Sequence, residues 1–120
     1  MDCIFCKIAK KEVPKEFIYE SEEVLSFADI RPSAPVHYLL IPKEHIDSIA
    51  DLKDGHQTLV AKLIFAAKEV AEKLRLKGYK LVFNVGPEGG QVIPHIHLHL
   101  IGGWTKKEDI EHMPHPGLDK

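Results

Sequence analysis

Three histidines near the carboxyl end of the sequence occupy alternate positions, in the stretch PHIHLHLIGG at residues 94–103. In a β-strand, successive side chains point to opposite faces of the sheet. His95, His97 and His99 would therefore share one face, while the isoleucine and leucines between them would face the core. A polar stripe facing solvent or a site for metal alone would also explain the pattern. Three imidazoles in one row next to a glycine-rich loop favour a site that performs chemistry.

A single zinc ion cannot easily take all three imidazoles of this row. Neighbouring Cα atoms of the row lie about 6.7 Å apart along a strand, and the outer two lie about 13 Å apart. Two nitrogens bound to one zinc ion are at most roughly 4 Å apart. We therefore expect at least one of the three histidines to remain free of metal.

Near the amino end lies a Cys-x-x-Cys pair, Cys3 and Cys6. Such a pair could be redox-active, although it lacks the preceding strand of a thioredoxin-like motif, or it could be two small buried residues. Its spacing also suits tetrahedral zinc, which needs two further ligands. The best available ligands are His45, just after an expected strand, and His95. These four residues predict a closed, structural zinc site, which would leave the other two histidines of the row free.

A free, neutral imidazole is a good nucleophile toward phosphorus near neutral pH, because its ordinary pKa is about 6.5. The segment GPEGGQV at residues 86–92 offers small residues and backbone N–H groups that can approach an anion, although it could equally be a flexible turn. Together, the loop and the histidine row favour a phosphate that is held by backbone donors and attacked by a histidine. A second histidine would then bind the charged oxygens or assist proton transfer.

Three further polar residues lie at the ends of expected strands, and each has two interpretations. Asp29 could bind ribose hydroxyls or begin the turn before Arg31. His37 could orient the nucleophilic imidazole or be an ordinary edge residue. Asn84 could contact phosphate or be a turn residue.

The bulk properties indicate one domain, and its net charge does not point to a highly charged binding partner. The chain has 120 residues, a net charge of −2 and an apolar fraction of 44%, which is ordinary for a globular protein. This charge balance supplies no general case for binding nucleic acid or an anionic membrane. The first residues lack the long apolar run of a signal peptide or a transmembrane span, so we expect a cytoplasmic protein without a disulfide framework.

The apolar pattern predicts an α+β fold. One long helix is expected over residues 55–76, with an apolar stripe that consists of Leu59, Leu63, Ile64, Ala67, Val70, Ala71 and Leu74. Short helical turns are expected near residues 3–8 and 48–52. Strands are expected at residues 17–20, 24–28, 37–41, 80–85 and 95–101. Because one long helix cannot connect a repeated parallel sheet, the strands are expected to pair mostly antiparallel.

The order and spacing of these motifs resemble the histidine-triad family. HIHLHLI matches its His-x-His-x-His signature, and the match continues through IFCKIAKKEVP, VLSFADIRPSAPVHYLLIPKEHI and NVGPEGGQ. The resemblance covers roughly residues 3–103, with a tail from residue 104 to 120. It is specifically similar to the Hint branch, the histidine triad nucleotide-binding proteins, and to the members of that branch that retain a zinc site.

This resemblance implies a homodimer whose two sheets join, a purine nucleoside monophosphate as ligand, a structural zinc ion, and hydrolysis of phosphoramidate or related bonds at the α-phosphorus. It implies that His97 is the nucleophile that forms a nucleotidyl-histidine, that His99 contacts the phosphate, and that His37 supports the catalytic imidazole. The other residues that it implies are Asp29 for the ribose hydroxyls, Phe5, Ile8, Phe27 and Ile30 for the base, Asn84, Gly90 and the backbone N–H of Val92 for the phosphate, and Cys3, Cys6, His45 and His95 for zinc.

The sequence departs from the family pattern at two places. Val92 replaces a hydroxyl residue that is common in relatives, so that only its backbone can help to bind phosphate. The tail from Trp104 onward differs from the Trp-Pro-containing ending of the eukaryotic members, where it reaches the partner's site and influences the leaving group. Two alternative functions stay open: hydrolysis of dinucleoside polyphosphates, and a zinc-stapled nucleotide-binding or adaptor role with little turnover.

Overall fold

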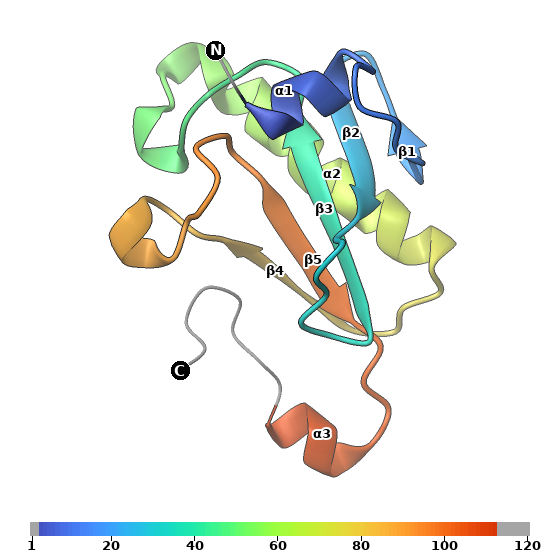
Figure 1. Cartoon of the computed structure of the whole chain (residues 1–120). Helices are drawn as coiled ribbons and strands as arrows, with labels where there is room; N and C mark the ends of the chain where they lie inside the picture. The colour runs from blue at the N-terminus through green and yellow to red at the C-terminus, as the bar shows by residue number, and fades with distance from the viewer. Residues whose placement is uncertain (1–2, 113–120) are drawn as a thin grey trace.

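The computed structural model describes residues 3–112, which form one five-stranded sheet with helices on both faces (Figure 1). The elements are α1 (Ile4–Ala9), β1 (Tyr19–Glu20), β2 (Val24–Ala28), β3 (Val36–Pro42), η1 (Ile49–Asp51), η2 (Asp54–His56), α2 (Gln57–Lys73), β4 (Tyr79–Phe83), η3 (Pro87–Gly89), β5 (Leu98–Gly102) and α3 (Lys107–Glu111). The strand order is β1-β2-β3-β5-β4, and every neighbouring pair is antiparallel. The expected α+β class and antiparallel pairing are therefore confirmed.

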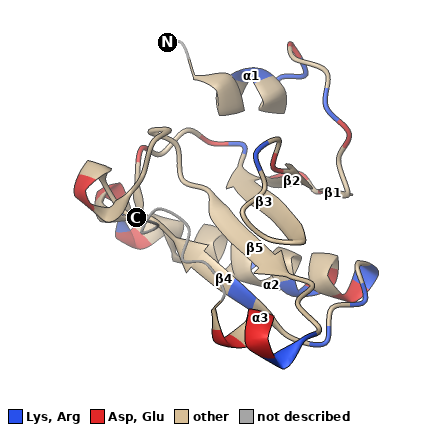
Figure 2. Ribbon diagram, turned by 60° about the horizontal axis from the view of Figure 1, so that its bottom comes forward, with Lys and Arg blue, Asp and Glu red and all other residues tan. Residues whose placement is uncertain are grey.

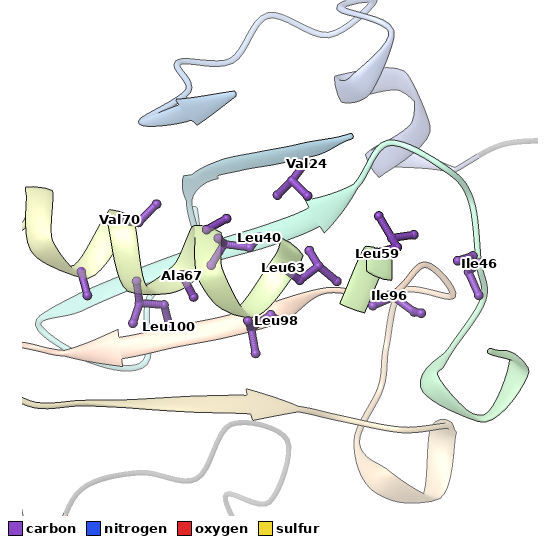
Figure 3. Packing of buried hydrophobic residues seen from close by; sticks show 12 residues of the cluster. Val24, Leu40, Ile46, Leu59, Leu63, Ala67, Val70, Ile96, Leu98 and Leu100 are labelled. Atoms are coloured by element: carbon purple, nitrogen blue, oxygen red, sulfur yellow. The ribbon is translucent and has the colours of Figure 1, made fainter. Parts of the chain in front are cut away.

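The long helix α2 covers one face of the sheet and forms the larger part of the core (Figure 3). Leu63, Ala67 and Val70 of the helix pack against Leu98 and Leu100 of β5, and all five are at most 1% exposed. Burial of apolar surface contributes about 25 cal/mol of free energy per Å², and this contribution is what mainly holds the helix on the sheet. The leucines that alternate with the histidines therefore hold β5 against α2, on the face opposite the histidines.

The short helix α1 lies on the opposite face, near β2 and β3 (Figure 1). Phe5 and Ile8 of this helix pack against Phe27 of β2 and Leu39 of β3. The Cys3 side chain accepts a hydrogen bond from the backbone N–H of Cys6, which caps the first turn of the helix. This second, smaller core forms the wall against which the histidines lie.

Several expected boundaries differ from the structure. The first strand is shorter than expected, and β5 begins at Leu98 rather than at residue 95. Pro94 has no N–H for a ladder, and the N–H of Ile96 donates to the carbonyl of Ile46 in the loop after β3. The ladder of β5 therefore begins only at Leu98, and His95 lies in the segment that leads into it.

The long helix is also shorter than the expected residues 55–76, and its apolar stripe differs at two positions. Ile64 was expected in the stripe but is 39% exposed, whereas Ala66 is buried. A single helix on a sheet buries only a narrow stripe, and Ile64 lies at the margin of that stripe. A further short helix, α3, follows the sheet in the segment that was treated only as a tail.

Charged residues gather on α2, on α3 and on the loop between α1 and β1, whereas β3 and β5 carry almost none (Figure 2). Within residues 3–112, no helix is long and apolar enough to cross a membrane.

Candidate active site and metal centre

His97 is held by the backbone of the segment that leads into β5. Its Nδ1 lies 2.7 Å from the carbonyl oxygen of His95, and the ring packs edge-on against Phe5 at a centroid distance of 5.1 Å. Because a carbonyl only accepts, Nδ1 carries the proton in the neutral ring, and Nε2 has a free lone pair. His97 lines a cavity of about 600 Å³ on the α1 face of the sheet, and an imidazole with a free lone pair is able to act as a nucleophile.

His37 and His99 are joined by a hydrogen bond of 2.9 Å between Nε2 of His37 and Nδ1 of His99. The backbone N–H of Ser33 donates to Nδ1 of His37 at 3.0 Å, so this nitrogen is an acceptor and the His37 proton lies on Nε2. His37 therefore donates to His99, and His99 carries its own proton on Nε2. That Nε2 lies 3.4 Å from the side-chain amide of Asn84, where a phosphate oxygen could accept from it.

The three histidines of the cavity are neutral near pH 7. Burial lowers the pKa of His97, and burial together with the charges of His97 and His37 lowers the pKa of His99 to about 4. Burial also lowers the pKa of His37, although the Asp29 carboxylate opposes this effect. A neutral His97 is the form that can attack phosphorus.

Asp29 forms the turn that was one of its two interpretations from sequence, and its carboxylate also faces the histidines. One carboxylate oxygen, Oδ1, accepts from the backbone N–H of Arg31 at 2.8 Å and so forms the turn after β2. The other, Oδ2, lies 3.4 Å from Nε2 of His37. Asp29 also lines the cavity, so its carboxylate remains close enough for a hydroxyl group of a ligand.

The glycine-rich segment forms a compact loop at the edge of the cavity. Gly90, with φ of +88°, adopts a left-handed conformation that L side chains rarely enter. The Gln91 side chain accepts from the backbone N–H of Gly86 at 2.8 Å. Val92, which follows, is 89% exposed at the rim. The loop is therefore fixed in shape rather than a free turn.

The other end of the cavity is apolar. It is lined by the buried side chains of Phe5, Ile8 and Phe27, whose phenyl rings lie 5.9 Å apart. Ile30 also lines the cavity but is 78% exposed, so it lies at the mouth rather than inside. One cavity thus has a polar end with histidines and an apolar end lined by aromatic and aliphatic side chains, which suits an aromatic ring.

Cys3, Cys6, His45 and His95 form a separate group in which one ligand atom from each lies within 4.8 Å of the others. Nδ1 of His95 is 3.3 Å from the Cys3 sulfur, and Nδ1 of His45 is 3.2 Å from the Cys6 sulfur. A tetrahedral zinc ion with bonds of about 2.3 Å to sulfur and 2.0 Å to nitrogen places these atoms roughly 3.5 Å apart. The four side chains therefore already have nearly the spacing that zinc requires.

In both His45 and His95 the proton lies on Nε2, which leaves Nδ1 free to bind a metal ion. Nε2 of His95 donates to the carbonyl of Pro42 at 2.8 Å, and Nε2 of His45 donates to the Asp47 carboxylate at 2.7 Å. Both Nδ1 lone pairs thus face the sulfurs, as in metal sites where the second nitrogen is held by an acceptor. Burial and the neighbouring Cys3 raise the pKa of Cys6, so that a nearby cation would favour the thiolate form of Cys6.

The structure brings every predicted non-metal residue to one cavity and the four predicted metal ligands to one cluster. A polar stripe that faces solvent is excluded, because each histidine of the row is at most 9% exposed. Four contributors were not predicted: the N–H of Ser33, the Asp47 carboxylate, the Gln91 side chain and Lys15 at the apolar end. Asp47 stands two residues after His45, a spacing that could have indicated its role.

Comparison with known proteins agrees with this geometry. The profile of a family described as "Scavenger mRNA decapping enzyme C-term binding" matches residues 2–111. The chain is 46% identical over 102 residues to protein HitA of Neisseria gonorrhoeae, covering 84% of this chain and 95% of that protein. It is also 46% identical over 103 residues to a 14 kDa zinc-binding protein of Zea mays, covering 83% of this chain and 80% of that one.

A solved structure shares both fold and sequence. The crystal structure of a HIT family hydrolase from Legionella pneumophila Philadelphia 1 superposes with a TM-score of 0.82 and 48% sequence identity. The alignment covers 87% of this chain and 95% of that one.

Proposed function

The chain belongs to the histidine triad (HIT) family, and from this premise we propose that it is a nucleotide hydrolase that cleaves purine nucleoside 5′-phosphoramidates or related bonds at the α-phosphorus. One observation carries the proposal. His97 is neutral, its Nδ1 proton is held by a carbonyl, and its Nε2 lone pair is free beside a cavity that has both a polar and an apolar end.

In the first step, Nε2 of His97 forms a bond to the α-phosphorus and the bond to the leaving nitrogen breaks. The leaving nitrogen departs with the electron pair of that bond and takes one proton from solvent. His97 keeps its Nδ1 proton and becomes a cationic nucleotidyl-histidine, whose charge the carbonyl of His95 stabilises at 2.7 Å. The Nε2–H of His99, oriented by His37, donates to a phosphate oxygen while negative charge develops there.

In the second step, water adds its oxygen to phosphorus and gives one proton to solvent. The electron pair of the phosphorus–nitrogen bond returns to Nε2, and the nucleoside monophosphate leaves. His97 is then neutral again, and the protons taken up and released in the two steps balance. Splitting the displacement in this way replaces one difficult step by two easier ones.

The remaining residues of the cavity provide places for the rest of the nucleotide. The phosphate would lie among His99, Asn84 and the backbone of the loop at Gly90. Asp29 would bind the ribose hydroxyls. The base would occupy the apolar end, lined by Phe5, Ile8 and Phe27 with Ile30 at the mouth, while Val92 contributes its backbone N–H.

We further propose that Cys3, Cys6, His45 and His95 hold a structural zinc ion. The donor set, the sulfur–nitrogen separations and the relative with zinc binding in its name support this assignment. Bound zinc would tie α1 to the segment before β5 and so hold Phe5 beside His97. It would contribute to folding rather than to the bond-breaking steps.

We also propose that the protein is a homodimer in which the two sheets join through β4. This strand is an edge of the sheet, and two of its apolar side chains, Tyr79 and Leu81, are 38% and 37% exposed. On α2, Phe65 is 70% exposed. An exposed edge strand with apolar side chains is a template for pairing with a second chain. Light scattering coupled to gel filtration tests this: a Leu81→Lys variant should shift the mass from two chains to one.

The decisive experiment is hydrolysis of adenosine 5′-phosphoramidate by the wild type, His97→Ala and His112→Ala at equal folded concentration. His112 is an exposed histidine at the end of α3 and serves as the matched control. We expect turnover by the wild type and the control and a loss of several orders of magnitude in His97→Ala. Equal turnover by all three proteins would refute the mechanism. Cleavage of a diadenosine polyphosphate alone would instead favour the alternative hydrolase.

A further inference from the structure

Lys15 lies at the apolar end of the cavity, in the loop between α1 and β1. Its ammonium nitrogen is 5.3 Å from the centroid of the Phe27 ring, within the range of a cation–π contact. The same end of the cavity is lined by the buried side chains of Phe5, Ile8 and Leu39. The Lys15 ammonium thus lies beside the apolar end of the cavity.

The charge of Lys15 is not neutralised locally. Within residues 3–112 no carboxylate forms an ion pair with it, although Lys11, Lys43 and Lys62 all have glutamate partners. The side chain is partly buried and lies over the Phe27 ring, and within the same residues no acceptor forms a hydrogen bond with it. Its N–H groups therefore remain available to a ligand, and they can only donate.

Two purine bases present different edges to such a donor. Guanine carries two acceptors side by side, O6 and N7, whereas adenine carries the acceptor N7 next to the donor group N6–H₂. An ammonium group can bind both acceptors of guanine, but it meets the amino group of adenine without a hydrogen bond. Unpaired polar groups at a recognition site are costly, so this difference discriminates between the two bases.

We propose that Lys15 reads the base edge and makes this protein prefer 6-oxopurine nucleotides, the guanine type, over adenine nucleotides. The inference rests on the proposed function, because it requires the base to occupy the apolar end of the cavity. It goes further by naming the residue that selects the base. A lysine that instead contacted the phosphate would increase the affinity for all purine nucleotides equally.

The test measures binding of GMP, IMP and AMP by calorimetry to the wild type, to Lys15→Met and to Lys77→Met. IMP shares O6 and N7 with GMP but lacks the 2-amino group. Methionine keeps an unbranched apolar stem that can pack on Phe27 while it removes the charge. Lys77, which does not line the cavity, is the control for the loss of one positive charge.

We expect the wild type and Lys77→Met to bind GMP and IMP about tenfold more tightly than AMP. In Lys15→Met the three affinities should agree within about twofold, mainly because GMP and IMP lose affinity. Equal affinities in the wild type, or an equal loss for all three nucleotides in Lys15→Met, would overturn the assignment of Lys15 while leaving the proposed function intact. A preference for GMP over both IMP and AMP would also overturn it, since the 2-amino group would then be the feature recognised. Binding of none of the three would refute the proposed function itself.

Discussion

The side-chain amide of Gln91 donates to the backbone carbonyl of Asp47 at 2.6 Å. This bond joins the glycine-rich loop at the cavity to the segment that carries a metal ligand, because the Asp47 carboxylate accepts from His45 at 2.7 Å. The same Gln91 amide donates to the carbonyl of Ile93 and accepts from the N–H of Gly86. One side chain thus connects the proposed phosphate loop with the proposed zinc centre.

Replacing Gln91 by leucine should therefore loosen the phosphate loop. The substitution removes three hydrogen bonds and leaves their backbone partners without the side chain, which we expect to cost about 1–3 kcal/mol in the free energy of unfolding. In steady-state kinetics, KM for a nucleoside phosphoramidate should rise several-fold more than kcat falls. Gln57→Leu, at the exposed start of α2, is the control. An unchanged KM in Gln91→Leu would show that the loop keeps its shape without this amide.

The hydrogen bond from His37 to His99 leads to a prediction about the catalytic rate of His37 variants. His37→Phe removes the donor that fixes the proton of His99 on the nitrogen facing the cavity, so kcat should fall by about 10²-fold. His37→Gln should retain much more activity, because its amide N–H can still donate to Nδ1 of His99. Measurement of kcat at saturating substrate compares the two. An equal loss in both variants would mean that the shape of the imidazole, and not its proton, is what matters.

Much of this site could be predicted from the sequence because strand alternation is a strong constraint. Alternation alone places His97 and His99 on the face opposite to Leu98, and the structure agrees. It also holds for His95, whose ring contacts Phe5 as the ring of His97 does. Alternation does not reveal where the strand begins, because the N–H of Ile96 donates outside the ladder and β5 starts only at Leu98. A local hydrogen-bond pattern of this kind depends on the distant carbonyl of Ile46, which no spacing rule reveals.

Contacts made by the backbone and by loops were beyond prediction for the same reason. The N–H of Ser33 fixes the proton of His37, yet every residue type except proline supplies an N–H at that position. The position of Lys15 depends on how the loop after α1 returns to β1, and loop paths carry little periodic signal. The residue type shows which chemistry a side chain can perform, whereas the tertiary structure determines which backbone groups form hydrogen bonds with it.

Loss of zinc should destabilise the protein without direct loss of the nucleophile. The double variant Cys3→Ser with Cys6→Ser should bind less than one tenth of the zinc of the wild type and unfold at a lower temperature, since a structural zinc ion contributes binding free energy to folding. Zinc content by plasma mass spectrometry and thermal unfolding measure the two effects. Unchanged zinc stoichiometry would contradict the ligand assignment.

The low pKa of His99 predicts that stability decreases in acid. Burial first, and then the charges of His97 and His37, lower this pKa to about 4 in the folded protein, against about 6.5 in the unfolded chain. The unfolded chain therefore binds more protons between these values, so the contribution is complete above pH 6.5 and is lost as the pH falls toward 4. At pH 5 the loss from His99 amounts to about 2 kcal/mol.

Urea unfolding at pH 7 and pH 5, with zinc present in both buffers, measures this effect. His99→Gln has no group that titrates in this range, so its stability should fall less than that of the wild type between the two pH values. Measured zinc content at each pH separates the titration of His99 from loss of metal. A pH dependence equal to that of the wild type would contradict the assignment of the shift to His99.

Ser26 and Ser48 are both buried, but we expect replacement by alanine to affect the stability of the protein differently at the two positions. The hydroxyl of Ser26 in β2 is fully buried and has no hydrogen-bond partner among the described residues. Ser26→Ala removes a polar group that water can no longer satisfy, so it should leave stability unchanged or raise it by about 1 kcal/mol. Ser48, by contrast, accepts from the N–H of Ala50 at the start of η1 and donates to Asp51.

Ser48→Ala should therefore lower the free energy of unfolding by about 1 kcal/mol, as the loss of a helix N-cap usually does. Chemical denaturation of both variants against the wild type, with zinc bound, decides between these expectations. Neither serine lines the cavity, so neither variant should change nucleotide affinity. Destabilisation by more than 1 kcal/mol in Ser26→Ala would mean that its hydroxyl has an acceptor in solution and that β2 is held to the α2 layer by more than apolar packing.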